Sequence, residues 1–530
     1  MATRSFKGPR GTRDMYPEDM LRRRYLMQTW RDTSIRHGFE EIEGPTFEEA
    51  ELYAVKSGEG ILGELFQAFS GKSPEEVEQV KSTGRAPFAM RPEFTPTLAR
   101  MYAARAANLP RPTRWFMAGP FFRAERPQRG RLREFLQWNC DVIGASDERG
   151  DTGQPRLIES DFWCLCTCLD ALIGFGLGQD PLGNRPPTRI RLSDRQLVAS
   201  ALLAYGVEAA AIPAVLMVFD KAESYSVDAK REALVRAGVA EANVIDVESI
   251  PSYHGAFDLS FKTLLSNLNK TATLTPNTGD YRTAGLQELH RLLAVINLSG
   301  YVELDLRIVR GLAYYTGTVF EVVAEGERAV AGGGRYDNLI ELLGGPPTPA
   351  VGFAMGDVVL SLLLEDKGLM PEGPELMDAL SRRPASLRPE AFVIGANDEA
   401  SDAPVRRLVA DLRRGVESPA YLEREGRKPW HADRYEPASG GVRPMHARAS
   451  DKSTRNLKKL LNDAERQFAR FAVILHGDGS DPGRVQIKDM DARKDLTPAD
   501  IPGLPSDIAE FSADPASPVY AGRAIAALTR

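Results

Sequence analysis

The segment AGPFFRAERPQRGRLREFLQWNCDVIG, residues 118–144, decides the fold and the chemistry expected of this chain. Two apolar runs, 115–122 and 135–143, flank a polar loop, and this pattern predicts a long antiparallel hairpin. The loop is rich in arginine, whose planar guanidinium donates a fork of hydrogen bonds that matches phosphate oxygens. A solvated basic loop is the alternative. Arg123 and Glu125 favour an anion site, because they alternate with apolar residues inside the expected strand and therefore share one face.

Length and charge set the broad class of the protein. The chain has 530 residues and a formal net charge of -6, and this length predicts roughly two to four domains. The near balance of charges argues against a protein that coats nucleic acid through bulk positive charge. Residues 111–134 nevertheless hold seven arginines and two glutamates, so we expect a local basic surface at the hairpin.

The cysteines, the histidines and the N-terminal sequence argue against several further classes. Cys164, Cys166 and Cys168 lie at i, i+2 and i+4 in an apolar stretch, which predicts small buried side chains on a helix rather than a disulfide framework or a zinc site. None of the six histidines lies at metal-ligand spacing, so we predict no protein-bound metal. Because neither a signal-peptide core nor a run of roughly 18 apolar residues is found, we expect no membrane contact and a cytoplasmic location.

Local patterns predict further elements near the hairpin. The spacing of apolar residues predicts a helix over 17–37, followed by a strand. Residues 88–102 are typical of a short strand, a turn and a helix. The three glycines at 332–334 lack the lysine and the Ser/Thr of a phosphate-binding loop, so we expect a tight turn between a strand and a helix there.

The later part of the chain changes character twice. Residues 189–300 are rich in Ala and Leu at helical spacing and indicate a helical module. Residues 371–389 are polar and contain proline, which is typical of a linker. Beyond them, strands alternate with helices near 404–414 and 452–463, a pattern that predicts a small α/β domain with a partly parallel sheet. Residues 421–450 follow no pattern.

Two motifs resemble one enzyme family. FRAERPQRGRLREFLQWNCDVIG resembles motif 2 of the class II aminoacyl-tRNA synthetases, in the form found in histidyl-tRNA synthetases. RIVRGLAYYTGTVFE, residues 307–321, resembles a signature peculiar to histidyl-tRNA synthetases, which usually has an acidic residue in place of Ala313. The helix and strand that end at Pro45 are similar to motif 1, which lies at a dimer interface in this family. The resemblance runs from residue 9 to about residue 502.

The resemblance implies an α+β fold, in which the antiparallel sheet of a class II synthetase is flanked by helices. The implied divisions are a catalytic core in two parts (1–188 and 301–370), a mainly helical insertion (189–300), a linker (371–389) and a C-terminal α/β anticodon-binding domain (390–530).

The implied activity is that of a histidine–tRNA ligase. Histidine and ATP would form histidyl-adenylate and pyrophosphate, and a terminal ribose hydroxyl of tRNA(His) would then take the histidyl group. ATP is a substrate, and Mg²⁺ would arrive with it, held largely by the phosphates. The implied partners are histidine, ATP, tRNA(His) and a second copy of the chain in a homodimer.

The resemblance also assigns roles to charged residues around the nucleotide. Arg310 would be the catalytic electrostatic group beside the α-phosphate, and Arg123 would contact the α-phosphate and the substrate carboxylate. Arg131 would reach the γ-phosphate, and Glu125 would accept from the adenine amino group. The loop tip would approach the tRNA acceptor end through Gln128, Arg129 and Gly130.

For histidine, the resemblance implies a set of buried polar partners. Asp141 and Tyr315 would contact the imidazole, because unsatisfied partners reject a substrate that lacks its N–H groups. Three further positions match the α-amino site and two more tyrosines match the pocket wall: Glu93, Thr95 and Gln137, and Tyr314 and Tyr336.

Motif 3 departs from the family pattern. In GFAMGDVVLSLLLE, Gly356 is followed by Asp357, Val358 and Val359, where the common form has a residue, an acid and an arginine. The arginine that stacks on adenine and touches the γ-phosphate is therefore missing at position 359. We expect the hairpin arginines to hold more of the nucleotide than usual.

A second function is compatible with the same resemblance. The chain could be a non-catalytic paralogue that senses histidine or binds a partner, like the synthetase-like regulatory subunit of ATP phosphoribosyltransferase. Such paralogues generally lack the C-terminal domain, whereas residues 453–501 resemble the anticodon-binding domain. That resemblance and the retained Arg123, Arg131 and Arg310 favour the enzyme.

Overall fold

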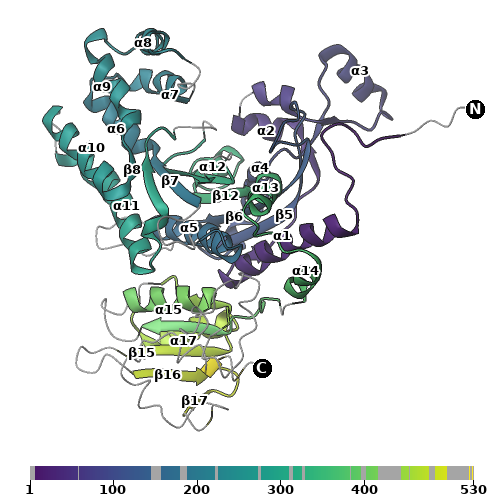
Figure 1. The fold of residues 1–530 in the computed structure, drawn as a ribbon, viewed down its shortest axis with the longest axis vertical. Helices are drawn as coiled ribbons and strands as arrows, with labels where there is room; N and C mark the ends of the chain where they lie inside the picture. The colour runs from purple at the N-terminus through teal and green to yellow at the C-terminus, as the bar shows by residue number, and fades with distance from the viewer. Residues whose placement is uncertain are drawn as a thin grey trace, which may run out of the picture.

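The structure is a computed structural model, and it describes most of the chain. The described residues are 6–57, 59–144, 157–178, 188–220, 225–271, 276–308, 314–324, 329–381, 384–395, 402–415, 443–452, 454–476, 484–497, 500, 524–525 and 528. Figure 1 shows a large sheet with helices on its flanks, a group of helices at the upper left and a smaller α/β domain at the bottom.

A nine-stranded sheet is the centre of the molecule. Its order is β1-β5-β6-β12-β11-β10-β7-β9-β8, and every neighbouring pair is antiparallel except β1 with β5 and β7 with β9. The strands are β1 (Glu40–Glu41), β5 (Thr113–Phe122), β6 (Glu134–Ile143), β7 (Thr188–Asp194), β8 (His254–Ala256), β9 (Val302–Asp305), β10 (Thr318–Ala324), β11 (Ala331–Arg335) and β12 (Ala350–Gly356). The expected antiparallel sheet of an α+β fold is confirmed.

Strands β5 and β6 form the predicted hairpin. They pair in an unbroken antiparallel register from Thr113 opposite Ile143 to Phe122 opposite Glu134. The placement of Arg123 inside the strand was wrong, because β5 ends at Phe122. One backbone bond, from Arg123 N to Arg133 O at 2.9 Å, continues the ladder directly beyond β5, and Gln128 and Arg131 form a separate antiparallel bridge at the loop tip. Proline and glycine in the loop then turn the chain away, since Pro127 has no N–H to pair.

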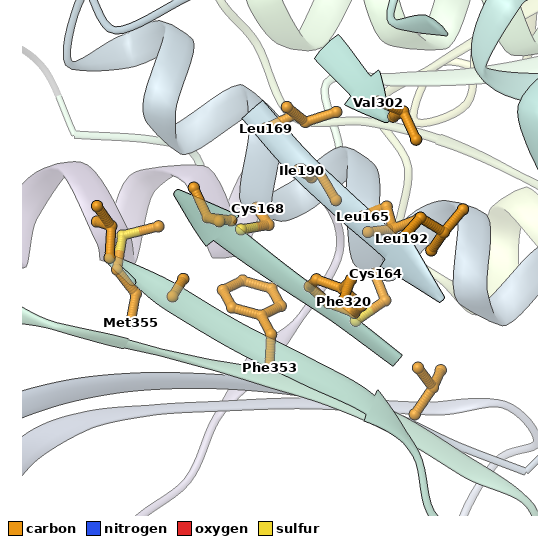
Figure 2. Close-up of a cluster of buried hydrophobic side chains, with 14 of the residues drawn as sticks. Cys164, Leu165, Cys168, Leu169, Ile190, Leu192, Val302, Phe320, Phe353 and Met355 are labelled. Carbon is orange, nitrogen blue, oxygen red and sulfur yellow. The ribbon is translucent and has the colours of Figure 1, made fainter. Parts of the chain in front are cut away.

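Helices α1 (Pro17–Arg36) and α5 (Leu157–Gly174) cover one face of the large sheet. Cys164, Cys166 and Cys168 on α5 are all buried, and burial raises the pKa of each thiol. Figure 2 shows Cys164 and Cys168 packed against Phe320 of β10 and Phe353 of β12. The three cysteines are therefore packing residues, as their spacing predicted.

The triple glycine lies inside strand β11 and not in a turn, so that prediction was wrong. Gly333 sits in register between Phe320 and Phe353 on the helix-covered face. A Cβ there would lie 2.7 Å from Phe353 Cβ and 2.8 Å from Phe320 Cζ. Gly332 and Gly334 face the other side of the sheet, because side chains alternate along a strand. The run of glycines lets large rings pack on one face and leaves space on the other.

The remaining elements before residue 380 surround this sheet. A small sheet of β2 (Phe47–Glu49), β4 (Phe88–Met90) and β3 (Gln67–Ala68) precedes the hairpin. The segment expected to be helical carries β7 and β8 as well as helices. The helices are α2 (Ala50–Ser57), α3 (Pro74–Thr83), α4 (Thr95–Ala103), α6 (Arg195–Ala204), α7 (Ile212–Asp220), α8 (Val227–Arg236), α9 (Val244–Ser249), α10 (Phe257–Thr271), α11 (Pro276–Val295), α12 (Leu339–Leu342), α13 (Asp357–Asp366) and α14 (Gly373–Leu380). Helix α14 lies within the segment expected to be a linker.

The C-terminal domain is a five-stranded sheet of order β14-β13-β15-β16-β17, parallel in its first two pairs and antiparallel in the last two. Its elements are β13 (Ala391–Gly395), α15 (Asp402–Arg414), β14 (Ala447–Ala449), α17 (Leu457–Arg466), β15 (Phe471–His476), β16 (Arg484–Asp489) and β17 (Lys494–Leu496). Along β13, Ala391 and Val393 pack toward α15, whereas Phe392 and Ile394 pack toward α17. The predicted α/β domain with a partly parallel sheet is confirmed.

Charged groups join the C-terminal domain to the large sheet. Arg414 Nε of α15 donates to Asp170 Oδ1 of α5 at 2.6 Å, and Asp170 Oδ2 lies 2.9 Å from His37 Nε2 at the end of α1. Arg114 of β5 pairs with Asp451 at 2.5 Å. These contacts bring α1, α5 and the hairpin against one side of the C-terminal domain (Figure 1).

We expect protonation linked to His37 to lower the free energy of unfolding as the pH falls below neutral. Burial and the nearby Arg413 lower the pKa of His37 from 6.5 to about 4. Between these two values the unfolded chain binds a proton that the folded chain does not, so the free energy of unfolding should decrease by about 3 kcal/mol as the pH falls through this window. Thermal unfolding at about pH 7 and about pH 4 measures the change. His37→Gln should show a smaller difference between the two pH values, and an equal difference would contradict this role.

Candidate active site

A cavity of about 870 Å³ lies on the side of the large sheet opposite α1 and α5. Three residues in register on neighbouring strands contribute to its lining, because Gly332 lies beside Ala354 and Ala354 lies beside Asn139. Eleven of the residues predicted from the sequence line it: Glu93, Thr95, Arg123, Gln128, Gly130, Arg131, Gln137, Asp141, Tyr314, Tyr315 and Tyr336. Segments far apart in the sequence therefore meet at one cavity.

At one end of the cavity, Asp141 is held by a tyrosine. Tyr336 Oη donates to Asp141 Oδ1 at 2.6 Å, and both side chains are buried. Burial and the neighbouring Asp141 raise the pKa of Tyr336 well above its ordinary value, so the phenol keeps its proton and serves as a donor. Gly352 makes room for the carboxylate, since a Cβ there would lie 1.8 Å from Asp141 Oδ1.

Aromatic rings form the wall beside this carboxylate. The ring centroids of Tyr314 and Tyr315 are 4.5 Å apart, and those of Tyr314 and Tyr336 are 6.0 Å apart. Burial raises the pKa of both Tyr314 and Tyr315, so both hydroxyls stay neutral. The combination of a carboxylate with neutral phenols suits a flat ring that carries N–H groups.

A buried ion pair fixes the backbone next to Tyr336. Arg335 NH2 lies 2.7 Å from Asp161 Oδ1 of α5, and its NH1 lies 3.1 Å from Asp337 Oδ1. Tyr336 N donates to Ala350 O at 2.7 Å. If Arg335 left its position, it would leave the buried carboxylate of Asp161 without a compensating charge, which is unfavourable. The ion pair therefore keeps Arg335 in place, and with it the adjacent Tyr336.

The hairpin forms another wall of the cavity. Arg123 Nε donates to Pro92 O at 3.2 Å, and its guanidinium lies 5.1 Å from the centroid of the Phe135 ring. Arg131 pairs with Glu125, and this carboxylate does not line the cavity. At the loop tip, Gly130 adopts φ 75°. Arg129 is exposed and lies 3.3 Å from Asp366 at the end of α13, away from the cavity.

The start of α13 occupies the place of motif 3. Val358 and Val359 line the cavity, so an apolar surface stands where an arginine was expected. Asp357 is buried, accepts from Leu136 N at 2.8 Å, and pairs with Arg13 NH2 at 2.6 Å. Arg310, the predicted catalytic group, falls in 309–313, outside the described residues.

Two features of the cavity escaped sequence reasoning. Asn139 lines it between Gln137 and Asp141, and its buried Nδ2 has no hydrogen-bond partner among the described residues. Gln137 Nε2 donates to Asn139 Oδ1 at 2.9 Å and so fixes the amide. The alternation Gln-Trp-Asn-Cys-Asp along the predicted strand was the available signal, since it places three polar residues on one face.

The second feature is a pair of arginines on the far side of the cavity. Arg307 donates to both carboxylate oxygens of Asp305, at 2.8 Å and 2.7 Å. Arg191 Nε lies 3.5 Å from the same carboxylate. All three line the cavity, and nothing in the sequence marked Arg191 as a neighbour of the other two.

Comparison with known sequences identifies the family. The model of the family described as "Histidyl-tRNA synthetase" matches residues 11–357, which is more than half of the chain. The chain belongs to the histidyl-tRNA synthetase family. A histidine–tRNA ligase of Opitutus terrae is 40% identical over 376 residues, covering 70% of this chain and 77% of that protein. That of Thermococcus kodakarensis is 32% identical over 488 residues, covering 91% and 93%.

Solved structures support the synthetase fold. The histidyl-tRNA synthetase of Nostoc sp. PCC 7120 superimposes with a TM-score of 0.54 at 20% identity, covering 96% of this chain and 99% of that one. A Bacillus halodurans protein described as an ATP phosphoribosyltransferase regulatory subunit/histidyl-tRNA synthetase gives 0.53 at 21% identity, covering 74% and 86%. None of the helices in the described ranges combines the length and hydropathy needed to cross a lipid bilayer.

Proposed function

We propose that this synthetase is a histidine–tRNA ligase whose first step takes place in the cavity that extends from the hairpin loop to Asp141. The carboxylate of histidine attacks the α-phosphate of ATP, and pyrophosphate leaves with the electron pair of the broken P–O bond. A terminal ribose hydroxyl of tRNA(His) then attacks the carbonyl carbon of histidyl-adenylate, and AMP leaves. The observation that supports this best is the Asp141–Tyr336 pair, which lies among aromatic rings in the same cavity as the Arg123 guanidinium.

Arg123 supplies positive charge where the reaction needs it. Attack on the α-phosphate increases negative charge on the equatorial oxygens, and a fixed guanidinium stabilises that charge without reorganising. The proposed roles of Glu125 and Arg131 require ATP to replace their mutual pair, with the adenine amino group donating to Glu125 and a γ-phosphate oxygen accepting from Arg131. Arg310 would act beside the α-phosphate. Mg²⁺ would arrive with the nucleotide.

Histidine recognition follows from complementary donors and acceptors. Asp141 accepts one imidazole N–H, and the neutral phenol of Tyr315 contacts the same ring. A side chain without an N–H would leave Asp141 with an unsatisfied lone pair in a buried site, which costs roughly 1 to 3 kcal/mol. Glu93, Thr95 and Gln137 would hold the α-amino group.

The test is histidine-dependent exchange of labelled pyrophosphate into ATP by the purified protein. Exchange that requires histidine and no other amino acid is the expected result. Histidine binding without exchange would favour the regulatory alternative. If the protein showed neither histidine binding nor exchange, both the ligase and the regulatory function would be excluded.

Asn139 should contribute to histidine affinity. We expect its Nδ2, which has no partner within the described ranges, to donate to the unprotonated imidazole nitrogen. The site would then recognise the neutral tautomer of imidazole with one donor and one acceptor. Asn139→Ala should raise the KM for histidine about tenfold and leave the KM for ATP unchanged. Ser193→Ala is the control, because Ser193 Oγ is also buried without a described partner but does not line the cavity. Equal effects of the two variants would contradict this role.

The proposed function includes two complexes, a homodimer and a complex with tRNA(His). The homodimer would use the helix α1 and the strand that follows it, as in motif 1 of the family. The acceptor end of tRNA(His) would lie at the loop tip, where Gln128 and Arg129 are exposed. Contacts between arginine and phosphate weaken with salt, so charging of tRNA should depend on ionic strength more steeply than pyrophosphate exchange does.

A further inference from the structure

The segment before α1 crosses the base of the hairpin loop. We call residues 9–13 the N-terminal strap. Thr12 N and Thr12 Oγ1 both donate to Pro9 O, at 3.1 Å and 2.7 Å, and so close a turn. At the top of this turn, Gly11 O accepts from Arg133 N at 2.8 Å. The strap is therefore bonded to the arm of the hairpin that leads into β6.

Gly11 allows this close approach. It adopts φ 88°, in the left-handed region that disfavours a side chain. A Cβ at this position would lie 2.6 Å from Pro127 Cγ and 3.0 Å from Arg133 Cγ. The strap thus touches both arms of the loop that carries Arg131.

Arg13 extends the strap to the start of α13. Its NH2 lies 2.6 Å from Asp357 Oδ2, while Asp357 Oδ1 accepts from Leu136 N at 2.8 Å. The Asp357 side chain is 5% exposed, and that of Arg13 is 34% exposed. One buried carboxylate therefore joins three separate parts of the chain, the strap, β6 and α13.

The neighbours of this carboxylate line the cavity. Phe135 precedes Leu136, and Gly356, Val358 and Val359 surround Asp357 in the sequence; all four line the cavity. A buried carboxylate that lost its cation would keep an uncompensated charge and would move toward solvent. Movement of Asp357 would therefore shift the part of the cavity wall that these four residues form, next to the hairpin residues proposed to bind ATP.

An acid and an arginine therefore still meet at the start of α13, although motif 3 has lost its own arginine. We propose that Arg13 is a positioning residue for ATP, which acts through Asp357 to hold the motif 3 helix against the hairpin. This inference rests on the proposed function, and it adds a residue that is 344 positions away from its partner.

The test compares Arg13→Ala, Asp357→Asn and the double variant. Arg13→Ala should raise the KM for ATP about tenfold in pyrophosphate exchange, with the KM for histidine within about twofold of the unaltered protein. Asp357→Asn keeps an acceptor for Leu136 N but removes the charge, and it should have a similar effect. The double variant should be no worse than the poorer single variant, because both remove one interaction.

Arg13→Lys should recover most of the ATP affinity, since a lysine also carries a positive charge. Arg10→Ala is the matched control, because Arg10 is exposed on the same strap. Parallel increases in both KM values, or additive effects in the double variant, would overturn the proposal. Calorimetric titration of ATP into each variant gives a readout that needs no turnover, so it separates this inference from a failure of the ligase activity itself.

Discussion

Arg123→Ala is expected to lower the rate of histidine-dependent pyrophosphate exchange about 100- to 1,000-fold. The Arg123 side chain lines the cavity and stays in place through a bond to Pro92 O and contact with the Phe135 ring. A cation fixed before the reaction stabilises the developing phosphate charge, and an alanine leaves that share of the charge to water and to the proposed Arg310. Since Val359 supplies no charge, the loss should be at the upper end of this range. The exchange rate at saturating histidine and ATP measures it.

Arg126→Ala is the control for the loss of one positive charge from the same loop. Arg126 is exposed, so its removal lowers the charge of the loop without changing the cavity wall. It should leave exchange almost unchanged. If Arg126→Ala lost as much activity as Arg123→Ala, the effect would come from the general charge of the loop, and the specific role of Arg123 would be wrong.

Gly352→Ala is expected to raise the KM for histidine about 100-fold. The new Cβ would lie 1.8 Å from Asp141 Oδ1 and 2.6 Å from Asp141 Cγ, so the carboxylate must leave its position. It would then lose its bond to Tyr336 and the proposed bond to imidazole together. ATP affinity should not change, because Arg123 and the start of α13 are untouched. Histidine and ATP titrations of the variant measure the two affinities separately.

Gly332→Ala is the control that distinguishes the displacement of Asp141 from a simple decrease in cavity volume. Gly332 also lines the cavity, but the nearest atom to a Cβ there is Phe320 O at 3.6 Å, an ordinary contact. This variant should retain histidine binding. Loss of binding in both variants would mean that the volume of the cavity, and not the position of Asp141, limits affinity.

The spacing of apolar residues along the sequence predicted those helices and strands whose formation depends on residues close together in the sequence. The hairpin and the helix at 17–37 were found because their apolar residues recur with the period of the element itself. The glycine run was misplaced because the reason for it is not local. Gly333 leaves space for Phe320 and Phe353, and these rings come from neighbouring strands.

Some residues of the candidate site were also predictable from the sequence, whereas others were found only from the structure. The resemblance supplied Asp141, Tyr315 and Tyr336, and the structure brings them to one cavity. It could not supply Asn139, because the lack of a partner for its Nδ2 in the described part of the chain is visible only when the hydrogen bonds around it are known. The pairing of Arg13 with Asp357 depends on the fold of the whole core.

Strand β5 has a contact with another part of the protein at each end. Arg114 near its start pairs with Asp451 of the C-terminal domain, and Arg123 just beyond its end lines the cavity. A paired strand rises about 3.3 Å per residue and does not shorten, so the nine residue-to-residue steps from Arg114 to Arg123 span roughly 30 Å as a stiff rod. A rod of this kind transmits displacement along its length. Any shift of the C-terminal domain toward Arg114 would therefore move the guanidinium of Arg123, which is proposed to lie beside the reacting phosphate.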